Sequence, residues 1–313
     1  MNKTEIYIAK QIITEALKED LGRADVTSLA IRPFYKGSKG FITAKANGVI
    51  AGLEIVKAVF CEIEPAAKVK FLVKDGARVK KGQQIVEIKA SFLTIMAGER
   101  IALNFLQRLS GIATLTAEYV AAAAPVKVLD TRKTTPGWRI LEKYAVRAGG
   151  GQNHRLGLYD QILIKDNHIA AAGGVKKSLE RVKKYKDSSK GLKPLVEIEC
   201  KPLKQVREAL PFLPQIIMLD NMSDQQIKQA SLLIRQASRK LKIEVSGGIT
   251  LDRLKTLRKL DIDFVSVGAL THSARALDLS LTLFSSRRSR TANLSAGRQG
   301  AAHANDTTSQ VGE

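Results

Sequence analysis

The sequence predicts an α/β protein in which a (β/α) barrel, open or incomplete, follows a smaller N-terminal α+β domain. Two observations predict this class. After Pro125, short β-branched runs alternate with helical stretches, which is the pattern of a parallel sheet covered by helices. Between residues 40 and 90, short segments alternate apolar and polar residues as strands do. We place the domains at 1–112 and 113–284, with a last segment that can return to the N-terminal domain. A polar tail at 285–313 is expected to be disordered.

The N-terminal domain should begin with a helix over residues 4–20. Apolar side chains recur on one face of this segment, and Gly22 follows as a stop signal. Strands are expected at "GFITAKA" (40–46), "KVKFLVK" (68–74) and "QQIVEIKA" (83–90), with a helix in 47–63 and a turn at 75–82.

A second helical region spans residues 92–124. We expect two pieces, broken near "LSGIAT" at 109–114. One face of the first piece is apolar and needs something to pack against, and a single barrel need not be its partner; its residues are Phe92, Ile95, Met96, Leu103 and Leu106.

Six β-branched runs follow, and each ends in polar residues or glycine. The runs are "VKVLDT", "QILIKD", "PLVEIEC", "QIIMLDN", "KIEVSGG" and "DFVSVGA". In a parallel barrel the carboxyl ends of all strands meet on one face, and that face holds the active site. Residues scattered over the second half of the chain should therefore converge in one pocket.

The pocket should hold a compact polyanion. Its expected cations are Arg132, Lys133, His154, Arg155 and Lys165. Several positive groups in one partly buried pocket repel each other unless acids or anionic ligands offset the cost. Arginine is suited to carboxylates because its planar fork gives bidentate hydrogen bonds.

A phosphate site is expected after the last two runs. "EVSGGIT" and "VSVGAL" place glycine between a strand and a helix start, where backbone N–H groups can face a phosphate. Two further carboxylates, Glu199 and Asp220, end neighbouring runs. They are either structural ion-pair partners of the cations, or they bind a ribose diol or Mg²⁺ with its pyrophosphate; the second interpretation is favoured because both lie at the expected barrel mouth.

Composition limits the partners. The formal net charge of +21 favours anionic partners, either nucleic acid or phosphorylated small molecules. Aromatic residues make up 5% and are not interleaved with basic ones, which weakens a single-strand-binding interpretation. No apolar run approaches the ~18 residues of a membrane span, and the start lacks the regions of a signal peptide. The two distant cysteines, Cys61 and Cys200, are expected to be buried thiols, so we expect a cytoplasmic protein.

The chain resembles the quinolinate phosphoribosyltransferase family over residues 5–284. The central match is "DTRKTTPGWRILEKYAVRAGGGQNHRLGLYDQILIKDNHI". Further matches, in the family's order, are "EDLGRADVTS", "GERIALNFLQRLSGIAT", "VEIEC", "MLDNM", "EVSGGIT" and "VSVGALTHSARALDLSL". One departure is Trp138, where the family is expected to carry an aliphatic residue.

The resemblance implies a reaction and an assembly. Quinolinate and phosphoribosyl pyrophosphate would give nicotinate mononucleotide, carbon dioxide and pyrophosphate, with Mg²⁺, in NAD biosynthesis. The N-terminal domain would pack on the partner of a homodimer or larger homo-oligomer with shared active sites.

The resemblance also implies residue roles. Arg100 would reach quinolinate in the partner's site, and Lys165 would lie between the two substrates. Lys165, Glu199 and Asp220 would be catalytic, and the two carboxylates would handle ribose and metal-bound pyrophosphate. The other quinolinate residues would be Thr131, Arg132, Lys133, His154 and Arg155, and the phosphate residues would be Ser246, Gly247, Gly248, Val267, Gly268 and Ala269.

Three alternatives stay open at this point. A phosphoribosyltransferase of the same fold could use another pyridine or pyrimidine acid, although one carboxylate would not need so many cations. A basic nucleic-acid-binding protein would show strongly salt-dependent binding. An aldolase-type barrel would use Lys165 as a Schiff base, which requires an apolar pocket that the neighbouring Asp166 and Asn167 do not suggest.

Overall fold

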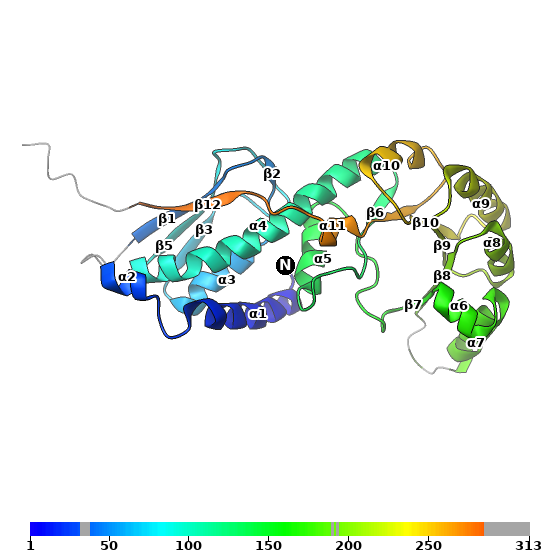
Figure 1. The fold of residues 1–313 in the computed structure, drawn as a ribbon, viewed down its shortest axis with the longest axis horizontal. Helices are drawn as coiled ribbons and strands as arrows, with labels where there is room; N and C mark the ends of the chain where they lie inside the picture. Colours follow the sequence, from blue (N-terminus) through cyan, green and yellow to red (C-terminus); the bar gives the residue numbers. More distant parts are fainter. Residues whose placement is uncertain (32–37, 189–190, 192–193, 285–313) are drawn as a thin grey trace, which may run out of the picture.

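The computed structural model describes residues 1–31, 38–188, 191 and 194–284. An N-terminal part with an antiparallel sheet lies beside a curved parallel sheet, which carries helices on its outer side (Figure 1). The long helix α4 (Phe92–Ala123) runs from one part to the other (Figure 1). The expected tail at 285–313 lies outside the described residues.

The N-terminal part is a four-stranded antiparallel sheet covered by helices. Its strand order is β12-β1-β5-β3, formed by Leu279–Phe284, Ser38–Ala44, Gln84–Ala90 and Lys68–Phe71. Strand β12 comes from the end of the described chain and pairs with β1 from Ala44↔Leu279 to Lys39↔Phe284. Helix α1 (Lys3–Leu21) contacts α3 (Leu53–Ile63) and α4, and the short α2 is Val26–Ile31.

Helix α1 occupies the expected range and ends where expected. Asn2 and Glu5 form a capping box at its start, and Gly22 follows Leu21 at its end. Its buried face includes Ala9, Ile13 and Leu17, the spacing that the sequence pattern predicts.

The expected turn and helix of this part need correction. The segment 47–63 begins with a two-residue strand, β2 (Gly48–Val49), and the turn at 75–82 contains its partner, β4 (Arg78–Val79). Helix α3 starts only after Gly52, which has φ 110°, and Asp75 Oδ1 accepts hydrogen bonds from the N–H groups of Gly52 and Leu53. The turn therefore supplies a side-chain acceptor at the start of the helix.

The expected break in the second helical region is wrong, because α4 is continuous over 32 residues. A Cβ on Gly111 would lie 2.0 Å from the carbonyl oxygen of Arg275, so this glycine permits close backbone packing. The apolar face of α4 is also largely satisfied within its own chain. Ile95, Leu103 and Leu106 are buried in the core, so this face gives no argument for a partner.

The parallel sheet has the order β6-β11-β10-β9-β8-β7. Its strands are β6 (Lys127–Leu129), β7 (Gln161–Ile164), β8 (Leu195–Cys200), β9 (Ile216–Asp220), β10 (Lys242–Ser246) and β11 (Phe264–Ser266). The helical segments are α5 (Arg139–Ala148), α6 (Asp166–Ala172), α7 (Val175–Ser188), α8 (Leu203–Ala209), the 3₁₀ turn η1 (Leu210–Phe212), α9 (Asp224–Ala237), α10 (Leu251–Leu257) and α11 (Ala269–His272). Each strand lies within one of the six predicted runs, and the sheet is an open barrel.

The opening lies between β6 and β7, the two edges of this sheet. The segment 149–155 runs beside β6, where Gln152 N donates to Val128 O (2.8 Å) and Asp130 N donates to Gln152 O (3.1 Å). The glycines at its start pack closely against helices. A Cβ on Gly149 would lie 2.4 Å from Ala113 O of α4.

The two cysteines differ in burial. Cys200 is buried as expected, but Cys61 is only partly buried, and both are free thiols. No helix among the described residues is long and apolar enough to cross a membrane.

Candidate active site

A cavity of about 780 Å³ opens at the carboxyl ends of the parallel strands. Each site residue predicted from the sequence lines it, with Arg100 as the exception. These are Thr131, Arg132, Lys133, His154, Arg155, Lys165, Glu199, Asp220, Ser246, Gly247, Gly248, Val267, Gly268 and Ala269. The convergence expected for a parallel barrel is therefore present in the fold.

Two arginines form a cationic end of the cavity. The guanidinium of Arg155 donates to Gln161 O (3.2 Å), and the whole residue is 9% exposed. Burial, and next the charge of Arg132, lower the pKa of Arg155. The Nε of Arg132 is buried and has no hydrogen-bond partner among the residues that the structure describes. Unsatisfied donors and mutual repulsion make this end a site for an anion.

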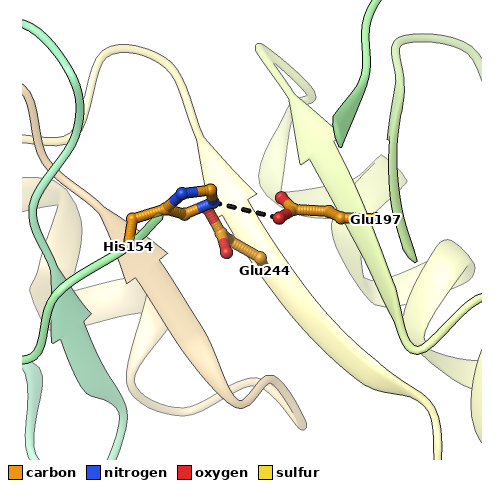
Figure 2. Close-up of side chains that lie close together, drawn as sticks. All are labelled: His154, Glu197 and Glu244. Atoms are coloured by element: carbon orange, nitrogen blue, oxygen red, sulfur yellow. Dashed lines mark hydrogen bonds and ion pairs between the residues drawn. The ribbon is translucent and has the colours of Figure 1, made fainter. Parts of the chain in front are cut away.

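The side chain of His154 extends from the 149–155 segment toward strands β8 and β10. Figure 2 shows its imidazole beside the carboxylates of Glu197 on β8 and Glu244 on β10. Its Nε2 lies 3.0 Å from Glu197 Oε2 and 3.7 Å from Glu244 Oε1. Its Nδ1 accepts a hydrogen bond from Arg155 N (2.8 Å). Both ring nitrogens therefore have partners inside the protein, although the side chain also lines the cavity.

The protonation of His154 is under opposing influences. Burial lowers its pKa, whereas the hydrogen bond to Glu197 and the charge of Glu244 raise it, and the rise prevails. The Arg155 N–H that points at Nδ1 opposes protonation at that atom, so this geometry fits the neutral ring with hydrogen on Nε2. A proton on Nδ1 would face this N–H donor, and no acceptor, at 2.8 Å.

Glu197 and Glu244 are fully buried below the cavity, and within the described part of the chain each has one oxygen without a partner. The hydroxyl of Ser266 donates to Glu244, and Gln161 Nε2 donates to Glu197 Oε2 (2.5 Å). Burial, and next the charge of Glu197, raise the pKa of Glu244 to about 8. A neutral Glu244 at pH 7 reduces the negative charge that the barrel interior must hold.

His154, Glu197 and Glu244 are close enough to be considered as metal ligands. The nitrogen that faces both carboxylates is Nε2, which carries hydrogen in the tautomer described above. A metal ion needs the lone pair of that nitrogen, so the hydrogen bonding here fits a proton better than a cation.

A second part of the cavity, beyond the ends of β7 and β8, has paired charges. Lys165 Nζ lies 3.3 Å from Glu199 Oε2, and Lys201 Nζ lies 2.7 Å from Asp166 Oδ2. The hydrogen bond from Lys201 lowers the pKa of Asp166, and the same contact raises the pKa of Lys201. Asp220, at the end of the next strand, accepts from Asn221 Nδ2 (2.9 Å). Glu199 and Asp220 thus present carboxylate oxygens to one space, which is the ligand type that Mg²⁺ prefers.

The glycine turns after β10 and β11 form a third part of the cavity. Gly247 and Gly248 have φ values of 90° and 58°, which favour glycine, and a Cβ on Gly247 would lie 2.1 Å from Asn221 Oδ1. Arg253 NH1 donates to Gly247 O (2.6 Å) and holds the turn in place. Gly268 immediately precedes α11.

Arg100 lies elsewhere in its own chain. It is exposed on α4 and lines a separate cavity of about 210 Å³ with Glu19, Asp20 and Trp138. The ring of Trp138 stacks on Phe105 of α4 at 4.6 Å, so this unusual residue packs against the N-terminal part and does not line the larger cavity.

Sequence reasoning missed several residues of the cavity. Lys201, Ser266 and His272 line it and were not predicted. Asp166 and Asn221 also line it; they end two of the predicted runs, so they were expected there, although without a role. Lys201 directly follows β8, so its position carried the same signal as the predicted strand-end residues. The buried Glu197 and Glu244 gave a weaker signal, as acids inside apolar runs.

Family models match both parts of the chain. The model described as quinolinate phosphoribosyl transferase, C-terminal domain, matches residues 112–282, and the model of the N-terminal domain matches residues 25–110. The chain belongs to the quinolinate phosphoribosyltransferase family.

Individual members of this family are similar over most of their length. "Quinolinate phosphoribosyltransferase [decarboxylating] 2b, mitochondrial" of Nicotiana tabacum is 41% identical and covers 88% of this chain and 82% of its own. "Probable nicotinate-nucleotide pyrophosphorylase [carboxylating]" of Bacillus subtilis is 41% identical and covers 90% of this chain and 95% of its own.

Solved structures agree with this assignment. NadC from Streptococcus pyogenes has a TM-score of 0.82 and 43% identity, and covers 88% of this chain and 95% of its own. The nicotinate-nucleotide pyrophosphorylase from Francisella tularensis has a TM-score of 0.83 and 35% identity, and covers 89% of this chain and 97% of its own. The quinolinate phosphoribosyltransferase fold thus includes both the N-terminal part and the open barrel.

Proposed function

We propose that this chain catalyses the decarboxylating transfer of a phosphoribosyl group to quinolinate in NAD biosynthesis. The products are nicotinate mononucleotide, carbon dioxide and pyrophosphate. One observation carries the proposal beyond family membership: a single cavity is lined by two neighbouring arginines, a lysine–carboxylate pair and two glycine turns. That arrangement suits a dicarboxylate beside a polyphosphate.

The two arginines and Lys133 bind the carboxylates of quinolinate. Arg155 is fixed by its hydrogen bond to Gln161 O, so its fork is oriented before the substrate arrives. Thr131 lies beside Arg132 and its Oγ1 accepts from Lys133 N (3.0 Å), which shapes the turn that presents both cations. His154 supports this end through Arg155 N and Glu197.

Phosphoribosyl pyrophosphate occupies the rest of the cavity. Ser246, Gly247, Gly248, Val267, Gly268 and Ala269 hold its terminal phosphate. Glu199 and Asp220 bind the ribose hydroxyls. Their carboxylates would also hold Mg²⁺, which would supply positive charge to offset that of the pyrophosphate. Lys165 lies beside Glu199, where its ammonium group can face both substrates.

Positioning and electrostatics account for the chemistry. The ring nitrogen of quinolinate attacks the anomeric carbon as pyrophosphate leaves, and Lys165 stabilises the negative charge that develops on the leaving group. The product ring is a cation, so it stabilises the electron pair left on its carbon when the adjacent carboxylate departs as carbon dioxide. A proton then replaces the carboxylate.

We further propose a homodimer or larger homo-oligomer in the cytoplasm. Two features support shared sites: Arg100 does not line the cavity of its own chain, and apolar side chains of α2 are exposed, with Val26 at 76% and Ile31 at 68%. The free cysteines support a reducing compartment, whereas the tobacco relative is named as mitochondrial.

The test is a product assay with purified protein, Mg²⁺ and phosphoribosyl pyrophosphate. Quinolinate should give nicotinate mononucleotide and carbon dioxide, and nicotinate should give no comparable turnover because one carboxylate leaves part of the arginine end unpaired. Turnover of nicotinate at a similar rate would favour a related acid as the substrate. Salt-dependent binding of DNA or RNA without turnover would favour the nucleic-acid alternative.

A further inference from the structure

A buried ion pair lies next to the two chain segments that carry the arginines of the cavity. Asp130, at the end of β6, is fully buried, and Lys143 of α5 is 1% exposed. The Lys143 ammonium donates to Asp130 Oδ1. Neither residue lines the cavity, so the pair does not belong to the substrate-binding surface.

This pair holds the main chain of His154 from both sides. His154 N donates to Asp130 Oδ1 (2.9 Å), and His154 O accepts from Lys143 Nζ (2.9 Å). Asn153 Nδ2 adds hydrogen bonds to Asp130 Oδ2 (2.6 Å) and Lys143 O (2.9 Å). We call Asp130, Lys143 and Asn153 the clamp.

The clamp acts where the sheet itself gives little support. The segment 149–155 lies in the opening between β6 and β7, and its pairing with β6 is a single isolated bridge, Leu129↔Gln152. Before the bridge, main-chain N–H groups of 149–151 donate to carbonyl groups of α5, and after Gln152 side chains rather than a strand ladder fix the path of the segment.

The two substrate-facing arginines lie close in sequence to the residues that the clamp joins. Arg132 follows Asp130 by two residues, and Arg155 follows His154 by one. Their charges repel, as the effect of Arg132 on the pKa of Arg155 indicates. An empty cavity therefore favours their separation, and something else must keep the two segments together.

We propose that the Asp130–Lys143 pair is a positioning device that fixes the separation of Arg132 and Arg155, and with it the fit to two carboxylates on one small ring. The inference rests on the proposed function and extends it to residues outside the cavity. A buried ion pair adds little net stability over apolar residues of similar size, and conformational specificity is the property it can contribute. Here that property is the alignment of two cationic segments.

The decisive experiment uses a double variant, Asp130→Asn with Lys143→Met, so that no unpaired charge is left in the core. Asn can still accept from His154 N, but no ammonium group remains for His154 O. We expect the KM for quinolinate to rise about 10- to 100-fold, as small misplacements of binding groups do. The KM for phosphoribosyl pyrophosphate should stay within about twofold, because its groups lie on other strands.

A matched control replaces an ion pair at the opposite ends of the strands. Arg235 NH2 lies 2.8 Å from Asp263 Oδ2, with side chains 16% and 18% exposed, and Asp263 precedes β11. The variant Arg235→Met with Asp263→Asn should change the melting temperature without separating the two KM values. An equal rise of both KM values in the clamp variant, or an unchanged KM for quinolinate, would overturn the proposal.

A milder variant keeps the test open if the double variant does not fold. Asn153→Ala removes two clamp hydrogen bonds without burying a charge, and should raise the KM for quinolinate about 3- to 10-fold, in line with the loss of one or two hydrogen bonds. A folded Asn153→Ala protein with a normal KM for quinolinate contradicts the clamp. Wild-type protein that forms no nicotinate mononucleotide contradicts the proposed function instead.

Discussion

Glu244 shows how one residue links the barrel interior to pH. Its carboxyl is fully buried between Glu197, His154 and Ser266, and its pKa is raised to about 8. The unfolded chain releases this proton near the ordinary value of 4.5, whereas the folded chain keeps it until about pH 8. The folded state therefore gains stability from holding this proton. The gain is complete below pH 4.5 and is lost as the pH rises toward and through 8.

The variant Glu244→Gln should remove that pH dependence, because its amide stays neutral. The melting temperature of the variant, relative to the wild type, should rise steadily between pH 5 and pH 8. Thermal unfolding in a buffer series measures the difference, and Glu62→Gln, at an exposed site on α3, is the control. A difference that is flat with pH would show that Glu244 ionises in the folded protein as it does in the unfolded chain.

The polar residues at the strand ends could be predicted from the sequence, but the buried charged residues that support them could not. Arg132 and Arg155 stand in conspicuous polar segments, and the structure places both at the cavity. Lys143 and Glu244 look like ordinary surface charges in their helix and strand patterns, yet both are buried. Their positions depend on which face of each element turns inward, and that follows from register and packing rather than from local pattern.

At the scale of elements, Gly111 decides how α4 meets the end of the barrel. In an exposed helix, replacing glycine with alanine is stabilising by about 1 kcal/mol. Here a Cβ would lie 2.0 Å from Arg275 O and 3.0 Å from Ala276 Cα, in the chain that leads to β12. Gly111→Ala should therefore be destabilising by about 1–3 kcal/mol or more, because backbone on both sides would have to move.

A second glycine of α4 provides the comparison. A Cβ on Gly98 would meet the side chain of Phe60 at 2.6 Å, and a side chain can shift more easily than backbone. Denaturant unfolding should give a larger loss of stability for Gly111→Ala than for Gly98→Ala. A smaller loss at Gly111 would mean that the 275–276 segment is free to move away.

Elements with a strong period could be predicted, and elements defined by contacts could not. The six parallel strands could be predicted because short β-branched runs alternate regularly with helical segments. The pair β2 and β4 has only two residues in each strand, which is too short to leave a pattern. In the sequence, the glycines at 111 and 149 look like breaks in a helix or in the chain. In the structure, Gly111 packs closely against the chain after α11, and Gly149 packs closely against α4.

At the scale of the whole molecule, the cavity and Arg100 remain apart within one chain. Arg100 lies on α4 and lines the smaller cavity, while the larger cavity opens at the carboxyl ends of the parallel strands. The sequence could indicate both parts, because each has its own motifs. It could not place them relative to each other, since that depends on β12 returning to β1 and on α4 spanning both.

Subunit complementation tests whether a second copy supplies Arg100. The variants Arg100→Ala and Lys165→Ala should each be nearly inactive, because each removes a cation from every shared site. If the proposed dimer is right, mixed dimers contain one site that lacks both cations and one intact site. Random pairing makes half of the dimers mixed, so co-refolding an equal mixture should restore about a quarter of wild-type activity on symmetric dimer arithmetic. Because Arg100 is exposed and Lys165 lies at a strand end, neither change should prevent folding. No recovery in a mixture shown to contain mixed dimers would mean that Arg100 acts in its own chain or outside the site.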